Sequence, residues 1–457
     1  MAHEILTSSL HSDIAYIYIP PNRNSDQLKW QEDTLIKQLI IEYLNNETRK
    51  RDTLTPKFKA ATDYLNSSVF MKITKEIEKY YSLKHKFNFD LSYDNDINFS
   101  KFLHNITLHI KEGSVSNLLD DCGTGLQSLT IIALHRVLAK LRHKNIIIGL
   151  EEPETNLHPQ AQRELINSIK NDSETSIEQI VFTTHSTVLI DNIDHRWISL
   201  ARKENDERRG FNTKINKLKR SFFQDHNIQE FNYNQFHYYR NSDFFYANYI
   251  IFVESKNDAE VVKYLASLNS IDLDLYGISI VNIDGVKNLP YPFFTVKDLN
   301  LPYIVILDKD YFIPYLNDDM EQSRDNQGFP KYRYEYKTNI LLNDLIPNER
   351  KQNEILGLLR TNHSKALDKL SEHNIILMNY NLEMDLLCSS KAVQEMLNKL
   401  NITNASNKNV HFLLTERKKA IKKLENIIHV LKTLENRNLP NSYKRIKNIT
   451  EELVKKI

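Results

Sequence analysis

The sequence predicts an α/β protein whose parallel sheets are flanked by helices. Short, unbroken apolar runs such as residues 249–253 (Tyr-Ile-Ile-Phe-Val) lead into helical patterns, which is typical of strands buried on both faces of a parallel sheet. Two such runs, 249–253 and 301–307, end directly in acidic residues. From about residue 391 onward the pattern is helical and rich in lysine, so a helical C-terminal region is expected.

Composition sets the broad class of the protein. The chain has 457 residues, of which 41% are hydrophobic and 26% charged, the balance of an ordinary soluble protein with room for two or three domains. Because the net charge is only +1, any basic surface that binds nucleic acid must be confined to a local patch. Two cysteines, Cys122 and Cys388, exclude a disulfide framework and suit a reducing compartment. No apolar run approaches the roughly 18 residues of a membrane span. We see no signal peptide, so we expect a cytoplasmic protein without membrane contact.

The first acidic junction lies after the run 249–253. Glu254 follows the last apolar residue, at the carboxyl end of the predicted strand, where α/β sheets bind their ligands. Asn257 is suited to cap the next helix, and Asp258 falls in the first turn of that helix. Glu254 and Asp258 are therefore expected to point at one place.

The second junction lies after the run 301–307. Asp308 and Asp310 flank Lys309, and alternation along an extended chain places both acids on one side. Crowded carboxylates repel each other, and a hard divalent cation with oxygen ligands, Mg²⁺ or Mn²⁺, neutralises such a cluster. Two such ions about 4 Å apart clamp the oxygens of a phosphodiester during hydrolysis. The alternative is a set of ordinary helix caps and solvated turns.

An acidic strand end followed by a strand ending in Asp-x-Asp resembles the Toprim domain, the metal-dependent catalytic module of topoisomerases, primases and OLD-family nucleases. Residues 278–285 fit the strand and glycine turn that lie between the two acidic motifs of such domains. The acids that this resemblance implies as metal ligands are Glu254, Asp258, Asp308 and Asp310. Among them, Glu254, Asp308 and Asp310 are also the implied catalytic acids.

Two further groups belong to this resemblance. OLD-family Toprim domains carry a late acid, here Glu383 or Asp385, with Glu383 preferred. They are also expected to carry a late lysine that stabilises the transition state, here Lys418 or Lys419. One departure is Ser255, because the residue after the Toprim glutamate is commonly glycine. Serine would strain a backbone that needs glycine, which predicts reduced metal affinity or activity.

An earlier set of motifs has the pattern of a nucleotide site. Gly123 and Gly125 stand at the start of a predicted helix, where exposed backbone N–H groups suit a phosphate, although a plain helix-start loop has the same pattern. Two further predicted strands, 145–150 and 179–184, end in polar residues. The first leads into Glu151-Glu152-Pro153-Glu154 and the second into His185-Ser186.

This order resembles the C-terminal half of an ABC-type ATPase of the kind found in OLD-family proteins, which makes ATP the implied nucleotide. Glu151 would then hold Mg²⁺, Glu152 would position the attacking water, and His185 would sense the γ-phosphate. Residues 156–159 would form the D-loop. The signature-loop residues that would contact the nucleotide of the opposite subunit are Gly123, Gly125, Gln127 and Ser128.

The sequence contains no Gly-x-x-x-x-Gly-Lys-Ser/Thr loop to hold the β- and γ-phosphates. In related ATPases this loop lies upstream of the strand that here ends at Pro20. We therefore expect either that the chain begins after this loop or that another polypeptide supplies it. ATP binding by this chain alone is then expected to be impaired, and the lobe would be vestigial, regulatory or architectural.

These motifs divide the chain into four parts. The predicted parts are a partial ATPase domain over 1–205 with a helical dimerisation arm over about 27–90, a linker over 206–248, a Toprim domain over 249–390 and a basic helical region over 391–457. The segment 201–248 mixes basic with aromatic residues, a composition that can bind single-stranded nucleic acid. We favour the alternative that its rings pack on the next domain.

The resemblance covers most of the chain and predicts a divalent-metal-dependent DNA endonuclease of the OLD type. Two copies would pair through the signature loops into a homodimer or higher oligomer, and a role in defence against phage follows from the family. One alternative is a catalytically weak scaffold that binds DNA or a partner protein. Another is a topoisomerase or primase. A topoisomerase would need a placed tyrosine nucleophile, and the ATPase-like half argues against both.

Overall fold

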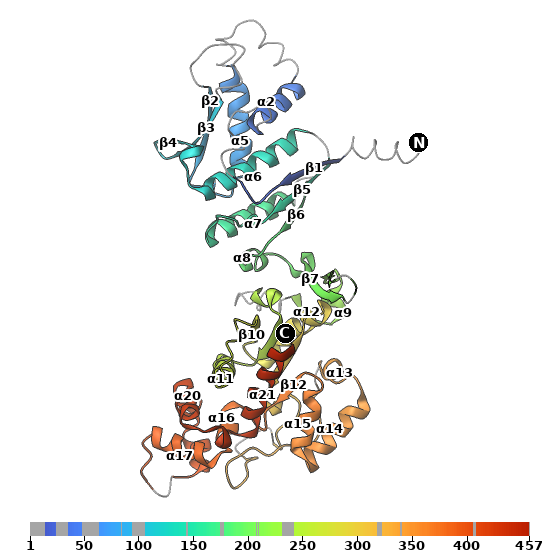
Figure 1. Ribbon diagram of the computed structural model, residues 1–457, viewed down its shortest axis with the longest axis vertical. Helices are drawn as coiled ribbons and strands as arrows, with labels where there is room; N and C mark the ends of the chain where they lie inside the picture. Colours follow the sequence, from blue (N-terminus) through green and yellow to red (C-terminus); the bar gives the residue numbers. More distant parts are fainter. Residues whose placement is uncertain are drawn as a thin grey trace. The chain divides into compact units, whose positions relative to one another are not determined.

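The computed structural model describes residues 14–23, 35–47, 64–83, 85–93, 106–142, 145–173, 178–206, 208, 210–230, 242–317, 322–338, 341–404 and 408–456. The chain forms two compact units, Met1–Ile193 and Asp194–Ile457 (Figure 1). The division lies before the predicted position at 205, because the hairpin of β7 (Ser199–Asp206) and β8 (Gly210–Lys217) joins the second unit. Arg202 of this hairpin donates a hydrogen bond to the carbonyl oxygen of Ala247 (3.0 Å).

The first unit is built on a parallel sheet with the strand order β1-β5-β6. Its strands are β1 (Ile14–Ile19), β5 (Asn145–Glu151) and β6 (Glu178–Thr183), close to the bounds that the apolar runs predicted. Ile19 pairs with Leu150, and Glu151 pairs with Thr183. The carboxyl ends of the three strands therefore meet at one edge of the sheet. A second, antiparallel sheet contains β2 (Asn88–Tyr93), β3 (Ile106–Glu112) and β4 (Val115–Leu118).

Helix α6 (Thr124–Leu141) forms the core of the first unit, and most of its side chains are buried. Helices α2 (Leu35–Asn46) and α5 (Met71–Tyr80) pack against it, and a π-helical turn (Leu65–Phe70) precedes α5. The described part of the predicted arm over 27–90 is thus packed into its own domain. The prediction of helix as far as residue 90 is wrong, since β2 begins at Asn88. The remainder of the arm lies outside the described residues.

Two more helices complete this unit. Helix α7 (Pro159–Ser173) begins at a proline, as the sequence predicted, because proline is favoured at the first position of a helix. Helix α8 (Thr187–Ile190) follows β6 and is capped by the hydroxyl of Ser186. Both helices start close to the carboxyl edge of the sheet.

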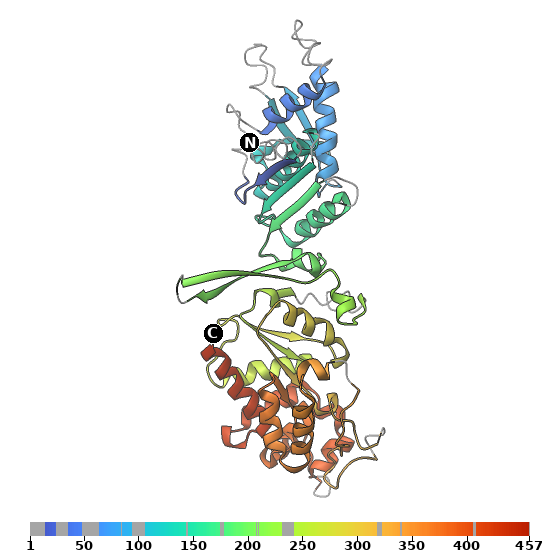
Figure 2. The same cartoon turned by 90° about the vertical axis from the view of Figure 1, so that its right-hand side faces the viewer.

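The second unit is built on a four-stranded parallel sheet with the order β10-β9-β11-β12 (Figure 2). Its strands are β9 (Tyr249–Val253), β10 (Ile278–Asn282), β11 (Tyr303–Leu307) and β12 (Ile375–Leu377). Phe252 pairs with Val281 on one side and with Val305 on the other. The two acidic junctions therefore lie on adjacent strands. The predicted glycine turn after β10 is present, with Gly285 at a φ of 102°.

Helices surround this sheet and make up the C-terminal region. They are α9 (Phe222–Asp225), α11 (Lys256–Ser267), α12 (Pro290–Asp298), α13 (Leu342–Leu345), α14 (Glu349–Thr361), α15 (His363–Ser371), α16 (Leu382–Leu386), α17 (Ser390–Lys399), α18 (Val410–Glu416), α19 (Lys418–Ile421), α20 (Leu424–Thr433) and α21 (Asn441–Lys456). The predicted helical C-terminal region is thus confirmed. Its Ile427 and Tyr443 share one buried core with Ile251 and Val253 of β9, so the region after residue 390 completes the core of the Toprim sheet.

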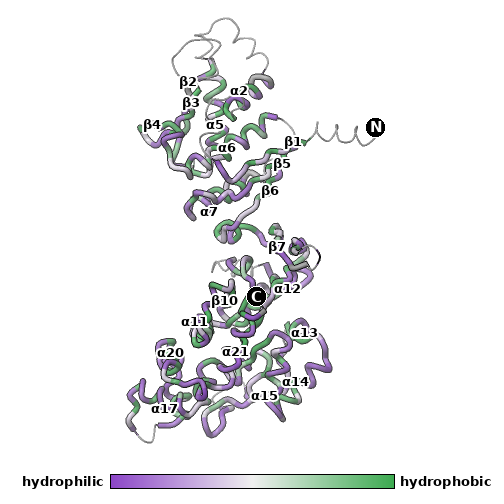
Figure 3. Tube along the Cα trace, in the orientation of Figure 1, coloured by the Kyte–Doolittle hydropathy of each residue, from purple (hydrophilic) through white to green (hydrophobic). Residues whose placement is uncertain are grey.

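Hydropathy follows the same layout. In Figure 3 the colours of α14, α15 and α17 alternate between apolar and polar, as expected for helices with one buried face. No helix within the described ranges is both long enough and apolar enough to cross a lipid bilayer.

Candidate active site

Glu254 and Asp308 come together at the carboxyl edge of the second sheet. Glu254 follows β9 and Asp308 follows the neighbouring parallel strand β11. Burial raises the pKa of Asp308 well above its usual range, and repulsion from Glu254, Asp258 and Asp310 adds to this effect. The predicted acids thus lie close enough to act on one another's protonation.

Ser255 holds Asp258 in place. The hydroxyl of Ser255 caps α11, and one carboxylate oxygen of Asp258 accepts hydrogen bonds from the backbone N–H (3.0 Å) and the hydroxyl (2.6 Å) of Ser255. The predicted cap at Asn257 is therefore wrong. The predicted strain at Ser255 is wrong as well, because its backbone is extended (φ −140°, ψ 168°), a conformation that any residue adopts.

Asp310 reaches the cluster by a different geometry from the one predicted. Residues Lys309–Tyr311 form a 3₁₀ turn, so alternation along an extended chain does not apply to Asp308 and Asp310. Asp310 nevertheless contributes to the raised pKa of both Glu254 and Asp308. Its carboxylate also lies 3.9 Å from the ammonium of Lys337.

Glu254 has a buried carboxylate oxygen, Oε2, without a hydrogen-bond partner, which suits a cation ligand, because buried carboxylate oxygens are normally bonded. Burial first, and then repulsion from Asp310, Asp258 and Glu383, raises its pKa to about 7. An oxygen-rich, negatively charged cluster of this kind fits Mg²⁺ or Mn²⁺.

Two of the carboxylates, those of Asp258 and Glu383, are engaged by protein groups in this structure. Asp258 is bonded to Ser255, and Oε1 of Glu383 lies 3.0 Å from Nζ of Lys422. Within the described ranges, no three His, Cys, Asp or Glu side chains have the geometry to hold a metal ion as they stand.

The raised pKa of Glu254 predicts how the stability of the metal-free protein depends on pH. An unfolded glutamate loses its proton near pH 4.5, whereas folded Glu254 keeps it up to about pH 7. Stability is thus expected to fall as pH rises through this window, and Mg²⁺ should reverse the fall because it favours the ionised carboxylate. Thermal unfolding at pH 5 and pH 8, with and without Mg²⁺, measures this effect. A Tm that is higher at pH 8 in the absence of metal would contradict the prediction.

Glu383 and Asp385 face different surroundings, although both belong to α16. Glu383 lies among the acids, where it adds to the raised pKa of Glu254, Asp258 and Asp308. Asp385 is fully buried and accepts hydrogen bonds from the backbone N–H groups of Asn379 (2.8 Å) and Tyr380 (2.7 Å). Asp385 therefore shapes the turn between β12 and α16, and Glu383 is the acid that adjoins the cluster.

The first unit gathers a second acidic group at the carboxyl ends of β5 and β6. Glu151 is the last residue of β5, Glu152 and Glu154 follow this strand, and His185 follows β6. The backbone N–H of His185 donates to Oε1 of Glu154 (2.7 Å), and Nε2 of His185 lies 3.9 Å from Oε1 of Glu152. The phenol of Tyr18 donates to Glu151. The residues predicted for metal, water and γ-phosphate contacts thus lie together.

The predicted signature loop splits into two parts. Gly123 caps α6 and is exposed, and a Cβ on Gly125 would lie 2.8 Å from the carbonyl oxygen of Asn156, so this loop closely approaches the predicted D-loop. Gln127 and Ser128 are buried instead. The Gln127 amide donates to the carbonyl of Cys122 (2.9 Å), so its side chain braces the loop inside its own domain. Only residues 123–126 remain accessible to a nucleotide.

Family models match these two regions. The AAA ATPase domain matches residues 8–190, and the Toprim domain of proteins like the overcoming lysogenization defect (OLD) protein matches residues 245–310. The chain combines an AAA ATPase domain with an OLD-like Toprim domain. This combination confirms the resemblance that the acidic motifs indicated.

Two curated relatives match part of this chain at low identity. The OLD nuclease of Thermus scotoductus is 23% identical over 279 residues, which cover 59% of this chain and 52% of that protein. Endonuclease GajA of Bacillus cereus is 25% identical over 292 residues, covering 55% of this chain and 42% of GajA. The chain thus spans about half the length of the curated relatives that it matches. A solved C-terminal region of the Burkholderia pseudomallei OLD protein is 17% identical and has a TM-score of 0.29, with 46% of this chain and 98% of that chain covered.

Lys422, like Lys337, contacts an acid of the cluster in the Toprim domain. It follows α19 (Lys418–Ile421), and its ammonium pairs with Glu383. Partial burial lowers its pKa, but attraction to Glu383, Asp308 and Glu254 outweighs this and raises the pKa overall. The sequence pointed to Lys418 or Lys419 in the same basic run. No local signal separates these lysines, because the choice depends on how the tail packs against the sheet.

Two buried cations also escaped the sequence analysis. Lys309 is only 5% exposed, and its ammonium lies 4.5 Å from the centre of the Tyr332 ring and 3.2 Å from Nε2 of His363. Burial lowers its pKa to about 8. In the ATPase domain, Arg23 is 2% exposed and donates to the backbone carbonyls of Glu151 and Glu152 (both 2.7 Å) and to the hydroxyl of Ser128 (2.7 Å). Arg23 thereby ties the loop after β1 to the acidic edge.

Proposed function

We propose that this chain is a divalent-metal-dependent DNA endonuclease whose reaction takes place in the Toprim domain. The observation that carries the proposal is the buried, partnerless Oε2 atom of Glu254 at a point where acids from β9, β11, α11 and α16 converge. The names of both curated relatives, a nuclease and an endonuclease, support the same activity.

The proposed roles follow from the contacts of each residue. Glu254, Asp258, Asp308 and Asp310 would hold Mg²⁺ or Mn²⁺, which when bound supplies Lewis-acid stabilisation of phosphate oxygens. One carboxylate of the cluster would accept the proton of an attacking water. Lys422, oriented by Glu383, would bring positive charge to the phosphate; it takes the place of Lys418 in this proposal.

Metal removal tests this function most directly. Supercoiled plasmid incubated with the chain and Mg²⁺ or Mn²⁺ is expected to become nicked or linear, and excess EDTA should abolish the reaction. Cleavage that persists unchanged in EDTA, or no cleavage with any divalent ion, would overturn the proposal.

Replacement of Lys422 by methionine is expected to lower the cleavage rate about 10- to 100-fold, the usual cost of losing a group that supports the reacting charges. Methionine keeps the unbranched, flexible side chain as far as Cε and lacks the ammonium group. Lys419→Met is the matched control, because Lys419 is an exposed lysine of the same basic run. Equal rates for both variants would show that Lys422 has no special role.

The ATPase domain is proposed to be a nucleotide-sensing or vestigial lobe that pairs two copies of the chain, with ATP bound tightly only when a partner polypeptide supplies the missing phosphate loop. The clustering of Glu151, Glu152 and His185 at one edge supports this proposal. Calorimetric titration of the purified chain with ATP and Mg²⁺ tests it. Tight binding by the chain alone would remove the need for a second polypeptide.

The second candidate function is a weak or inactive scaffold. We also propose a place in defence against phage, which the family suggests. The observation that favours the scaffold is that protein groups already engage Asp258 and Glu383. The plasmid assay separates the two candidates, because a scaffold binds DNA without cutting it in any divalent ion.

A further inference from the structure

The β7–β8 hairpin has two faces with different surroundings (light green in Figure 2). Alternation along the strands and the pairing register assign Arg202, Glu204 and Asn216 to the inner face. The outer face comprises Ser199, Ala201 and Lys203 of β7 and Phe211, Thr213, Ile215 and Lys217 of β8.

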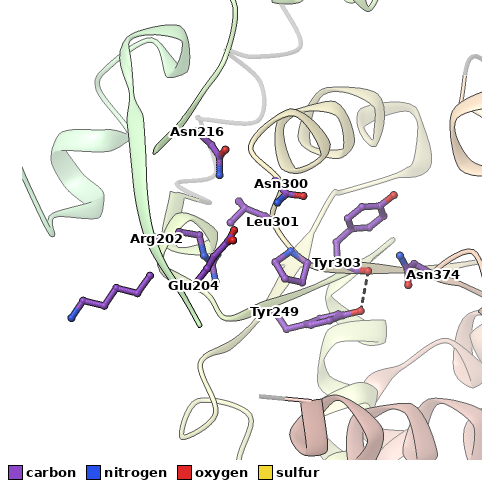
Figure 4. Close-up of a pocket in the computed structure, with 10 residues that line it drawn as sticks. Arg202, Glu204, Asn216, Tyr249, Asn300, Leu301, Tyr303 and Asn374 are labelled. Carbon is purple, nitrogen blue, oxygen red and sulfur yellow. Dashed lines mark hydrogen bonds between the residues drawn. The ribbon is translucent and has the colours of Figure 1, made fainter. Parts of the chain in front are cut away.

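The inner face is seated on the Toprim domain. Arg202, Glu204 and Asn216 line a cavity of about 480 Å³ together with residues at the amino ends of β9 and β11, among them Tyr249 and Tyr303 (Figure 4). The phenol of Tyr249 donates to the carbonyl oxygen of Tyr303 (3.1 Å). Arg202 of the inner face donates to the carbonyl oxygen of Ala247 (3.0 Å), just before β9, and so ties the hairpin to the amino end of the sheet, opposite to the acids.

The outer face leaves large apolar side chains in water. Phe211 is 64% and Ile215 70% exposed, and Trp197, two residues before β7, is 61% exposed. By contrast, the nearby rings of Phe222 and Phe245 pack against Tyr291 and His195. The prediction that the rings of segment 201–248 pack on the next domain therefore holds for only part of that segment. The aromatic residues at 231–239 lie outside the described residues.

Each exposed ring of the hairpin has a cation beside it. The ammonium of Lys203 lies 5.8 Å from the centre of the Phe211 ring. Lys217 and Arg220 lie 5.9 and 5.1 Å from the centre of the Trp197 ring. Phe211 and Lys217 lie six positions apart on β8, which corresponds to about 20 Å of strand. The hairpin thus carries two ring-and-cation pairs spaced along one ribbon.

We propose that the outer face of this hairpin, with Trp197, binds a single-stranded segment of DNA through base stacking on Trp197 and Phe211 and phosphate contacts from Lys203, Lys217 and Arg220. Single strands present the flat faces of their bases, whereas a duplex keeps them stacked on one another. The cations match the charge of the phosphates. The inference rests on the proposed function, in which DNA is the substrate. Because the acids lie at the other end of the strands, the hairpin would hold the substrate and take no part in the reaction itself; we call it a tether in this sense.

Binding is tested in the full chain carrying Asp308→Asn, which prevents cleavage during the measurement. A fluorescent oligo-dT strand is the probe, and a duplex of equal length is the comparison. Joint replacement of Trp197 and Phe211 by leucine is expected to weaken oligo-dT binding at least tenfold, since each stacked ring contributes to affinity. Replacement of Lys203 and Lys217 by alanine should lower the slope of log K against log salt concentration by about 0.7 per lysine.

Two matched controls separate stacking from general surface effects. Lys214→Ala removes a hairpin lysine of the inner face, which pairs with Glu204, and Leu275→Ala removes an apolar side chain that is 82% exposed elsewhere in the same unit. Neither should change oligo-dT binding by more than about twofold. The chain has two tryptophans, so oligo-dT should quench part of the fluorescence, and Trp197→Leu should abolish that part.

The outcomes distinguish this inference from the proposed function. Oligo-dT binding that depends on the hairpin, in a chain that cuts no plasmid, would support the tether and refute the nuclease. Plasmid cutting combined with unchanged oligo-dT affinity in the ring variant would refute the tether alone. Equal affinity for duplex and oligo-dT would also refute it, because the face would then contact phosphates without stacking on bases.

Discussion

Replacement of Asp308 by asparagine is expected to lower DNA cleavage at least about a hundredfold while it raises the thermal stability of the metal-free protein. Loss of an outer partner of a metal ligand already costs about 10- to 100-fold, so loss of a ligand itself should cost more. Asparagine keeps the shape of the side chain but lacks its charge.

The gain in stability follows from the sign of the pKa shift. Burial and the neighbouring acids raise the pKa of Asp308 well above its usual range. The folded aspartate therefore keeps its proton to a higher pH than the unfolded one does, so stability falls as pH rises above about 4. Asparagine removes this penalty, and the Tm at pH 7.5 without metal should rise by at least about 2 °C.

Plasmid cleavage and thermal unfolding of the same preparation measure both effects. Asp272→Asn is the control, because Asp272 is an exposed aspartate of the same unit and should change neither quantity. Cleavage within tenfold of wild type would remove Asp308 from the reaction centre. Loss of cleavage together with a lower Tm would assign Asp308 a structural role instead.

The sequence could predict the two acidic strand ends because their signal is local. An unbroken apolar run fixes the strand, and the next residue must then lie at its carboxyl end, which is how Glu254 and Asp308 were found. The order of the strands was not needed for this prediction, because all strands of a parallel sheet have their carboxyl ends at the same edge. The helical C-terminal region could be predicted for the same reason, because its helical pattern is also a local signal.

The remaining errors concern choices that tertiary packing makes. Ser255 was compared with a family glycine, yet its backbone is extended and its hydroxyl serves Asp258. Lys422 differs from Lys418 only by its place on a helical tail that folds back on the sheet. Glu383 and Asp385 stand two residues apart, and only the fold decides which one faces the cluster.

Replacement of Asp385 by alanine is expected to destabilise the Toprim domain by about 3 to 5 kcal/mol, because each hydrogen bond to a charged acceptor contributes about 1.5 to 3 kcal/mol. The carboxylate accepts two backbone N–H groups, from Asn379 and Tyr380, and is fully buried. Burial raises its pKa to about 6, so it is mostly ionised at pH 7.5. The variant leaves both donors without their acceptor.

Glu383→Ala is the matched variant on the same helix, and it should behave in the opposite way. Glu383 is only 11% exposed, but its loss also removes repulsion on Glu254 and Asp308, and its partner Lys422 is 61% exposed, so stability should change by less than about 1 kcal/mol. Cleavage should fall sharply all the same, because Glu383 orients Lys422 beside the acids. Urea unfolding followed by circular dichroism, together with plasmid cleavage, measures both variants. If Asp385→Ala kept wild-type stability and lost only cleavage, the late acid of this Toprim domain would be Asp385, and Glu383 would have no role in the reaction.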